Sequence, residues 1–200
     1  MMPTVVPTGL RSERLHLRRW READLAPFAD LNADPVVMEY YPAPLSRAES
    51  DAMVERIEGC FEDWGFGLWA VEVVAADEFA GYVGLWPATF EAPFTPAVEV
   101  GWRLAHRHWG RGFAPEAARA AVADGFGRLE LGEIVSFTAA INHPSRRVME
   151  KLGMTYDPTE DFDHPALPDG HRLRRHVLYR LTHPSPDARR PGDGSGPTWD

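Results

Sequence analysis

The segment RHWGRGFAPEA, residues 107–117, gathers positive charge and glycines directly ahead of a run of helix-forming residues. From Arg103 to Arg111 the chain holds three arginines, two histidines and no acid, although its formal net charge is −9. A glycine turn between a strand and a helix presents several backbone N–H groups to an anion at the positive end of the helix dipole. Gly110 and Gly112 allow the backbone to approach that anion without an intervening side chain. The segment therefore predicts a binding site for a phosphate or pyrophosphate group.

The pattern at this turn, Arg107-x-x-Gly110-x-Gly112, differs from two common phosphate loops. A Walker loop ends in Gly-Lys-Ser/Thr, which this sequence lacks. A dinucleotide fingerprint needs a third glycine or alanine where Pro115 stands, together with a parallel βαβ setting. We expect Arg107 and Arg111 to add charge-assisted hydrogen bonds to the anion. The alternative is a glycine turn whose arginines are simply solvated.

Hydrophobic periodicity and turn residues divide the chain into strands and helices. Strands are predicted over residues 15–20, 68–74, 79–90, 97–104, 134–138 and 175–181. Helices are predicted over residues 22–32, behind the capping box SRAE at 46–49, over 115–129 and over 142–153. This order describes an antiparallel meander that leads into one β-loop-α-β unit. It predicts an α+β mixed sandwich of the α/β class rather than a doubly wound Rossmann sheet.

Length and composition favour one domain. The 200 residues, 44% of them hydrophobic, suffice for a single core over residues 1–183, whereas residues 184–200 have linker composition and are expected to be disordered. The single cysteine, Cys60, allows no internal disulfide. Since the N-terminus is unlike a signal peptide and no apolar run reaches membrane-spanning length, we expect a cytoplasmic protein without a membrane partner. The negative charge argues against nucleic acid as a partner and is compatible with a cationic amine substrate.

Four segments carry a resemblance that is more specific than the glycine turn alone. In order and spacing, LRSERLHLRRWREAD, VEVGWRL, RHWGRGFAPEA and NHPSRRVMEKLGM resemble the GNAT superfamily of acetyl-CoA-dependent N-acetyltransferases, in particular its RimJ/RimL-type branch. The resemblance extends from residue 10 to about residue 181. It implies a central, mostly antiparallel sheet flanked by helices and splayed between its fourth and fifth strands. It also implies that acetyl-CoA, as co-substrate, lies in the V-shaped gap.

The resemblance further assigns residues to the coenzyme. Backbone groups of Trp102, Arg103 and Leu104 would pair with the pantetheine amides as though adding a strand to the sheet. Asn142 would meet the pantetheine arm from the other side. Helical spacing, rather than the resemblance, places Ser145 one turn past Asn142 and facing the same groove. The residues implied to wrap the pyrophosphate are His108, Trp109, Gly110, Arg111, Gly112, Phe113 and Ala114.

Acetyl transfer needs a group that accepts a proton from the attacking amine, and Glu99 is the leading candidate. Glu99 lies between Val98 and Val100, so its side chain points opposite to theirs. Partial burial would raise the pKa of its carboxyl group toward a useful range. The alternatives are a water chain that ends at a carboxylate, and a Glu99 that is merely solvent-facing or ion-paired.

Ser145 is the first candidate for protonating the leaving thiolate, although it is also placed to be a helix cap. Met149 stands where many members of the resembling family have a tyrosine, so water, or no specific acid, remains an alternative. His164 is a candidate acceptor-pocket residue or a loop histidine bonded to nearby acids. The histidines lack convincing metal-ligand spacing, and we expect no metal.

The favoured function is an N-acetyltransferase that moves acetyl from acetyl-CoA to a primary amine, either a protein N-terminal α-amine or a small molecule. A non-catalytic acyl-CoA-binding or regulatory module is the alternative. A nucleotide-phosphate-binding protein unrelated to CoA has less support, because it explains neither the strand before the turn nor Asn142. An exposed sheet edge expected near residues 175–181 makes a homodimer a further prediction.

Overall fold

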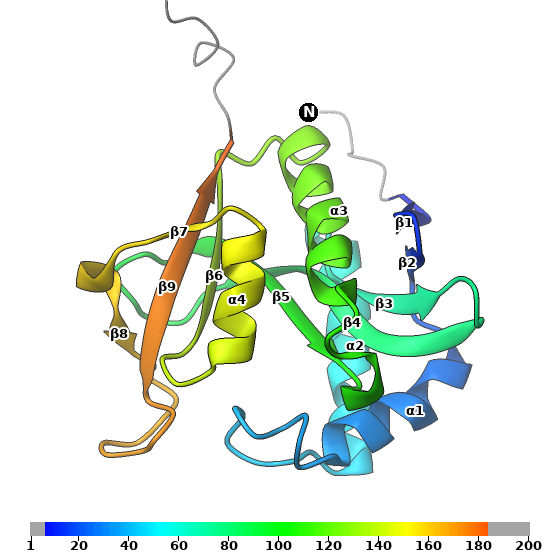
Figure 1. Cartoon of the computed structure of the whole chain (residues 1–200), viewed down its shortest axis with the longest axis horizontal. Coiled ribbons are helices and arrows are strands. Elements are labelled where there is room, and N and C mark those ends of the chain that lie inside the picture. Colours follow the sequence, from blue (N-terminus) through cyan, green and yellow to red (C-terminus); the bar gives the residue numbers. More distant parts are fainter. Residues whose placement is uncertain (1–6, 184–200) are drawn as a thin grey trace, which may run out of the picture.

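The computed structural model describes residues 7–183. The predicted C-terminal tail, residues 184–200, lies outside the described residues, as do residues 1–6. The described part holds a nine-stranded, mostly antiparallel sheet with four α-helices against it (Figure 1). This arrangement confirms the predicted mixed α/β fold.

The strands follow one another across the sheet in the order β1-β2-β3-β4-β5-β6-β9-β7, and β8 also pairs with β9. The sequence pattern predicts six of these strands and misses β1, β7 and β8, because two or three residues carry no readable periodicity. The bounds are β1 Gly9–Arg11, β2 Leu15–Arg18, β3 Leu68–Val73, β4 Glu78–Ala88, β5 Ala97–Leu104, β6 Glu133–Ala139, β7 Thr155–Tyr156, β8 Phe162–Asp163 and β9 Arg175–Thr182.

Strands β5 and β6 form the parallel pair of the sheet, and they separate almost at once. Their backbone pairing rests on one position, where Glu99 lies opposite Val135. Next to it, the Ser136 hydroxyl donates to the Val100 carbonyl oxygen at 2.9 Å. Beyond this point β5 runs obliquely away from β6 (Figure 1). Among the six predicted strands these are the fourth and fifth, so the predicted splay is confirmed.

Strand β9 is not a sheet edge. It pairs with β6 along one side and with the short strands β7 and β8 along the other. The exposed edge expected near residues 175–181 is therefore wrong, because two strands too short to predict cover it. The homodimer stays a prediction, without that edge as its reason.

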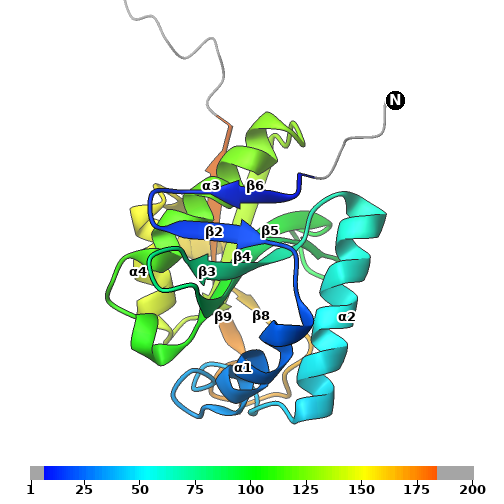
Figure 2. The same ribbon diagram turned by 90° about the vertical axis from the view of Figure 1, so that its right-hand side faces the viewer.

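The four helices are α1 (Glu22–Ala33), α2 (Arg47–Trp64), α3 (Phe113–Gly127) and α4 (His143–Lys151). Figure 2 shows α2 to one side of the strands and α3 and α4 to the other. The capping box at the start of α2 is confirmed, since the Ser46 side chain accepts from the Glu49 N–H. Gly65, with a φ of 73°, ends α2 in the left-handed conformation. None of the helices in residues 7–183 has the length and hydropathy that crossing a bilayer requires.

One hydrophobic cluster joins the helices to the sheet. Phe28 of α1 packs edge-on against Tyr82 of β4, and Phe61 of α2 lies 4.4 Å from Trp69 of β3, measured between ring centres. Helix α3 lies so close to β6 that a side chain at Gly125 would collide with buried neighbours. These contacts pack the helices on β3, β4 and β6, next to the point where the sheet divides.

Candidate active site

A cleft of about 870 Å³ opens where β5 and β6 separate. Its walls come from β5 and β6, the turn after β5, the starts of α3 and α4, and the segment between α1 and α2. Arg107 and Arg111 do not line it. The other residues that the sequence suggests for the site all do: Glu99, Trp102, Arg103, Leu104, His108, Trp109, Gly110, Gly112, Phe113, Ala114, Asn142 and Ser145.

The turn after β5 has a backbone that suits close approach of an anion. Gly110 and Gly112 have φ angles of 72° and 80°, a region that favours glycine. The first backbone bond inside α3 joins the Glu116 N–H to the Gly112 carbonyl oxygen at 3.2 Å. Within residues 7–183, the amides of Phe113 and Ala114 ahead of it therefore have no backbone acceptor and point outward from the positive end of α3.

Arg14 and Glu116 hold this turn against the N-terminal strands. The Glu116 carboxylate accepts hydrogen bonds from the Ser12 hydroxyl at 2.7 Å and from the Arg14 N–H and Nε at 2.9 and 2.7 Å. Arg14 also donates through Nη1 to the Arg111 carbonyl oxygen at 3.0 Å. Burial opposes ionisation of Glu116, but these hydrogen bonds lower the pKa of its carboxyl group. The sequence pattern misses this contact, because 102 residues separate its partners.

The two arginines expected to reach the anion are turned elsewhere. Arg107 donates through Nε to the Glu78 carboxylate at 2.7 Å. The guanidinium of Arg111 lies 4.7 Å from the centre of the Phe113 ring. Arg107 is thus engaged outside the cleft, whereas the Arg111 guanidinium lies over Phe113, a residue of the cleft wall.

Trp109 fastens the turn to the end of β5. Its indole N–H donates to the Leu104 carbonyl oxygen at 2.7 Å, and its ring lies edge-on to His106. One of the carbonyl groups expected to meet pantetheine therefore already accepts a hydrogen bond. His108 is buried next to this contact, and desolvation lowers the pKa of its imidazole, so the ring is neutral at pH 7.

Glu99 lies on the floor of the cleft, where β5 and β6 last touch. Glu99 is partly exposed, and desolvation raises the pKa of its carboxyl group to about 8. Within residues 7–183 it forms no hydrogen bond or ion pair. A carboxyl group with this pKa exchanges its proton near neutral pH, as a general base must.

Asn142 and Ser145 lie at the opposite wall, at the start of α4. Asn142 is the helix cap: its Oδ1 accepts from the Ser145 N–H at 3.2 Å, and its Nδ2 donates to the Thr138 hydroxyl at 2.9 Å. The Ser145 hydroxyl lines the cleft and has no hydrogen-bond partner among the described residues. Met149 is fully buried in the core and contributes no acid.

Two histidines close the far end of the cleft. The rings of His164 and His176 lie 5.0 Å apart, and His164 packs 4.8 Å from Phe90. Desolvation lowers the pKa of both, that of His176 to about 4, so both are neutral at pH 7. Between residues 7 and 183, no three His, Cys, Asp or Glu side chains are grouped to hold a metal ion. The need for a metal is not decided by this finding, and its absence stays a prediction.

Comparison with known proteins agrees with this geometry. Residues 14–155 match the family model of the acetyltransferase (GNAT) domain. Relatives include the uncharacterized protein YkkB of Bacillus subtilis (strain 168), 35% identical over 76% of this chain and 88% of that protein. Another is the FsC-acetyl coenzyme A-N(2)-transacetylase of Aspergillus fumigatus, 32% identical over 78% of this chain and 71% of that protein.

The fold has solved counterparts as well. The crystal structure of an acetyltransferase from Agrobacterium tumefaciens str. C58 superimposes with a TM-score of 0.71 at 27% identity, covering 92% of this chain and 98% of the other. The family match spans the parted strands, the glycine turn and the capped start of α4, which are the parts that form the cleft. The chain therefore belongs to the GNAT family of acetyltransferases.

Proposed function

We propose that this protein transfers acetyl from acetyl-CoA to the primary amine of a small molecule or a protein N-terminus. The observation that carries the proposal is the single backbone contact between β5 and β6, which leaves a cleft running from the glycine turn to Glu99. The donor's elongated shape fits such a cleft. The four motif segments favour the RimJ/RimL-type branch, and we retain the cytoplasm as the compartment.

Main-chain groups hold the donor in this proposal. The amides at the start of α3 bind the pyrophosphate, since Gly110 and Gly112 leave room for it. The unpaired edge of β5 beyond Glu99 binds the pantetheine amides, and Asn142 meets the arm from the side of α4. Acetyl-CoA supplies a thioester carbonyl, which a backbone N–H of β5 polarises.

Glu99 and Ser145 are the proposed participants in proton transfer. The amine nitrogen forms a bond to the thioester carbon, the carbon–sulfur bond breaks, and the nitrogen gives up one proton to Glu99, directly or through water. The departing thiolate takes up a proton from Ser145 or from water. The alternative, a module that binds acyl-CoA without chemistry, is less favoured, because Glu99 would then carry an unpaired, desolvated carboxyl group for no purpose.

Replacing Gly112 by valine tests the coenzyme site. Valine at φ 80° strains the backbone by roughly 1–2 kcal/mol, and its Cβ would lie 3.4 Å from Arg14 Nη2, the side chain that holds the turn. We expect calorimetry to show CoA affinity at least about tenfold weaker, with a matching loss of thiol release when acetyl-CoA meets a panel of amines.

Gly153→Val is the matched control, because Gly153 has the same φ of 80° and does not line the cleft. It should lose similar stability and keep its CoA affinity. Equal CoA affinity in the two variants would contradict the coenzyme site. Intact CoA binding by the parent protein without thiol release from any amine would favour the non-catalytic module instead.

A further inference from the structure

Arg103 is a buried arginine in the wall of the cleft. It alternates along β5 with Glu99, so both side chains leave the same face of the strand, opposite to Val100. Only 7% of Arg103 is exposed, and the residue lines the cleft. The guanidinium lies 3.9 Å from the centre of the Tyr41 ring, which belongs to the segment between α1 and α2.

Uncharged polar groups, the Asn32 amide and the Tyr41 side chain, are the hydrogen-bond partners of Arg103 among the described residues. Arg103 Nη1 donates to Asn32 Oδ1 at 2.6 Å, and the Asn32 amide donates in turn to the Ser50 hydroxyl at 2.8 Å. Nε is buried without a partner. Within residues 7–183, Arg103 enters no ion pair. Nε–H and one Nη2–H lie side by side on one edge of a guanidinium, the edge that a carboxylate binds with both oxygens.

Nearby groups of the chain do not neutralise this charge. Tyr82 lies 5.4 Å below the guanidinium, but desolvation raises the pKa of its phenol, which therefore stays uncharged. Desolvation likewise raises the pKa of Glu99 to about 8, so its carboxyl group is mostly uncharged at pH 7, and it forms no bond to Arg103. A buried cation without an anion is costly, because desolvation is uncompensated. An anionic ligand would supply the missing partner.

We propose that Arg103 binds a carboxylate of the amine acceptor through its guanidinium group, so that the acceptor is a carboxylate-bearing amine of the amino-acid or peptide type. This inference rests on the proposed function, since it assumes that the cleft receives an amine. The Cα atoms of Glu99 and Arg103 lie about 13 Å apart along β5, and both side chains are long enough to approach one molecule between them. A polyamine would instead bring a second cation against Arg103.

The test compares acceptors that differ in one charge. Several α-amino acids and dipeptides are each paired with their own carboxamide, and spermidine serves as a cationic acceptor. Thiol release gives kcat/KM for each. The ratio of kcat/KM for the acid to that for its carboxamide is measured in the parent protein and in Arg103→Met. Comparing ratios between proteins cancels the different reactivities of the two amines.

We expect this ratio to fall roughly 10- to 100-fold in Arg103→Met, because a charge-assisted bond is lost. Arg103→Lys keeps the charge without the paired donors and should lose about tenfold, which preserves the test if the methionine variant does not fold. Arg56→Met is the matched control: Arg56 is an exposed arginine at the same cleft, and the ratio should change by less than about threefold.

The outcomes separate the two proposals. Turnover of amines with an unchanged ratio in Arg103→Met and Arg103→Lys overturns the role of Arg103 and leaves the acetyltransferase intact. A parent protein that prefers spermidine or carboxamides also overturns the role of Arg103 and leaves the acetyltransferase intact. Absence of thiol release with every amine, while CoA still binds, overturns the proposed function and this inference with it.

Discussion

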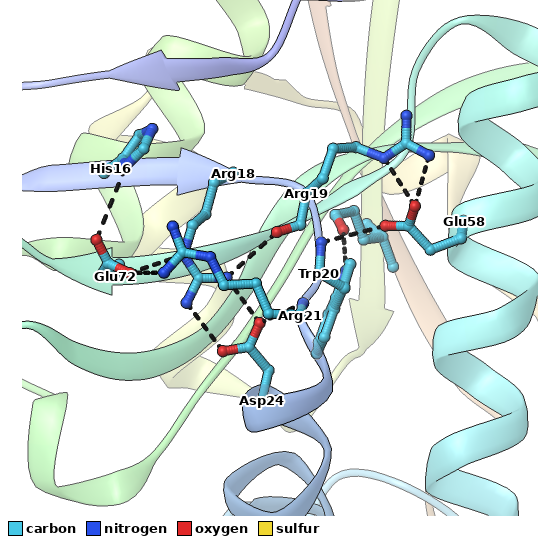
Figure 3. A network of polar contacts seen from close by, with 9 residues as sticks. His16, Arg18, Arg19, Trp20, Arg21, Asp24, Glu58 and Glu72 are labelled. Atoms are coloured by element: carbon cyan, nitrogen blue, oxygen red, sulfur yellow. Dashed lines mark hydrogen bonds and ion pairs between the residues drawn. The ribbon is translucent and has the colours of Figure 1, made fainter.

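Two buried arginines of this chain have nearly equal exposure and very different surroundings. Arg18 is 6% exposed and Arg103 is 7% exposed. Arg18 donates through Nε to Glu72 at 2.7 Å and through Nη1 and Nη2 to the two oxygens of Asp24 at 2.6 and 2.9 Å. Figure 3 shows this cluster, in which carboxylates from β3 and α1 converge on Arg18. Arg103 instead donates to a single amide oxygen and, among the described residues, to no carboxylate.

The difference distinguishes buried polar side chains that stabilise the fold from those that are available to a ligand. Around Arg18 the chain supplies the opposite charges itself, so the cluster is complete and links β2, β3 and α1. Arg103 Nε is buried without a partner, the Glu99 carboxyl group forms no hydrogen bond or ion pair within residues 7–183, and both residues line the cleft. A folded protein retains such incomplete groups at a cost, and the cost is understandable where a ligand completes them.

The same substitution at both arginines gives the largest contrast. Arg18→Met leaves Asp24 buried without its cation, and we expect a loss of about 3–5 kcal/mol in the free energy of unfolding. Arg103→Met removes a desolvated charge and leaves one amide oxygen of Asn32 unpaired, so we expect a loss of about 1 kcal/mol or less. Urea unfolding of both variants and the parent protein measures these values. Similar losses of unfolding free energy in the two variants would contradict this distinction.

Glu99→Gln tests the cleft, the second region of this comparison, through its effect on activity. Glutamine keeps the shape of the side chain but accepts no proton, so turnover should fall by about 10²-fold or more. CoA affinity should stay nearly unchanged, which calorimetry checks. Because the pKa of Glu99 is raised to about 8, kcat/KM of the parent protein should rise with pH through that value, and the variant should lack this inflection. Equal turnover would remove Glu99 from the mechanism.

The pH dependence of stability should show opposite slopes for the two regions. The pKa of Glu99 is raised from its ordinary 4.5 to about 8, so the folded protein holds a proton that the unfolded chain releases, and stability falls as pH rises between these values. Hydrogen bonds from Arg18 lower the pKa of Glu72, whose contribution is present above 4.5 and is lost as pH falls through its lowered pKa.

Unfolding measured between pH 3 and pH 9 on Glu99→Gln and Glu72→Gln checks these signs. The first variant should flatten the stability curve between pH 4.5 and about 8, and the second should flatten it below pH 4.5. A Glu99→Gln variant that parallels the parent protein up to pH 9 would mean that the carboxyl group is solvated rather than buried.

Local signals in the sequence account for much of this fold. The strand bounds of β5 are predicted without error, because alternation and flanking turn residues define them. The cap of α2 at Ser46 and the glycines of the turn after β5 follow from short-range chemistry that needs no distant partner. The same alternation places Glu99 correctly on the cleft side of β5.

What the sequence by itself determined is therefore the order of the elements, the turn, and the residues whose positions follow from it. The tertiary structure alone decided where long side chains end: Arg107 goes to Glu78, and Arg103 meets Asn32 from 71 positions away. It also decided that β9 is covered on both sides. The physical reason is that hydrogen bonds within a turn or a helix cap depend on neighbours in sequence, whereas charge pairing and burial depend on which distant segments the core brings together.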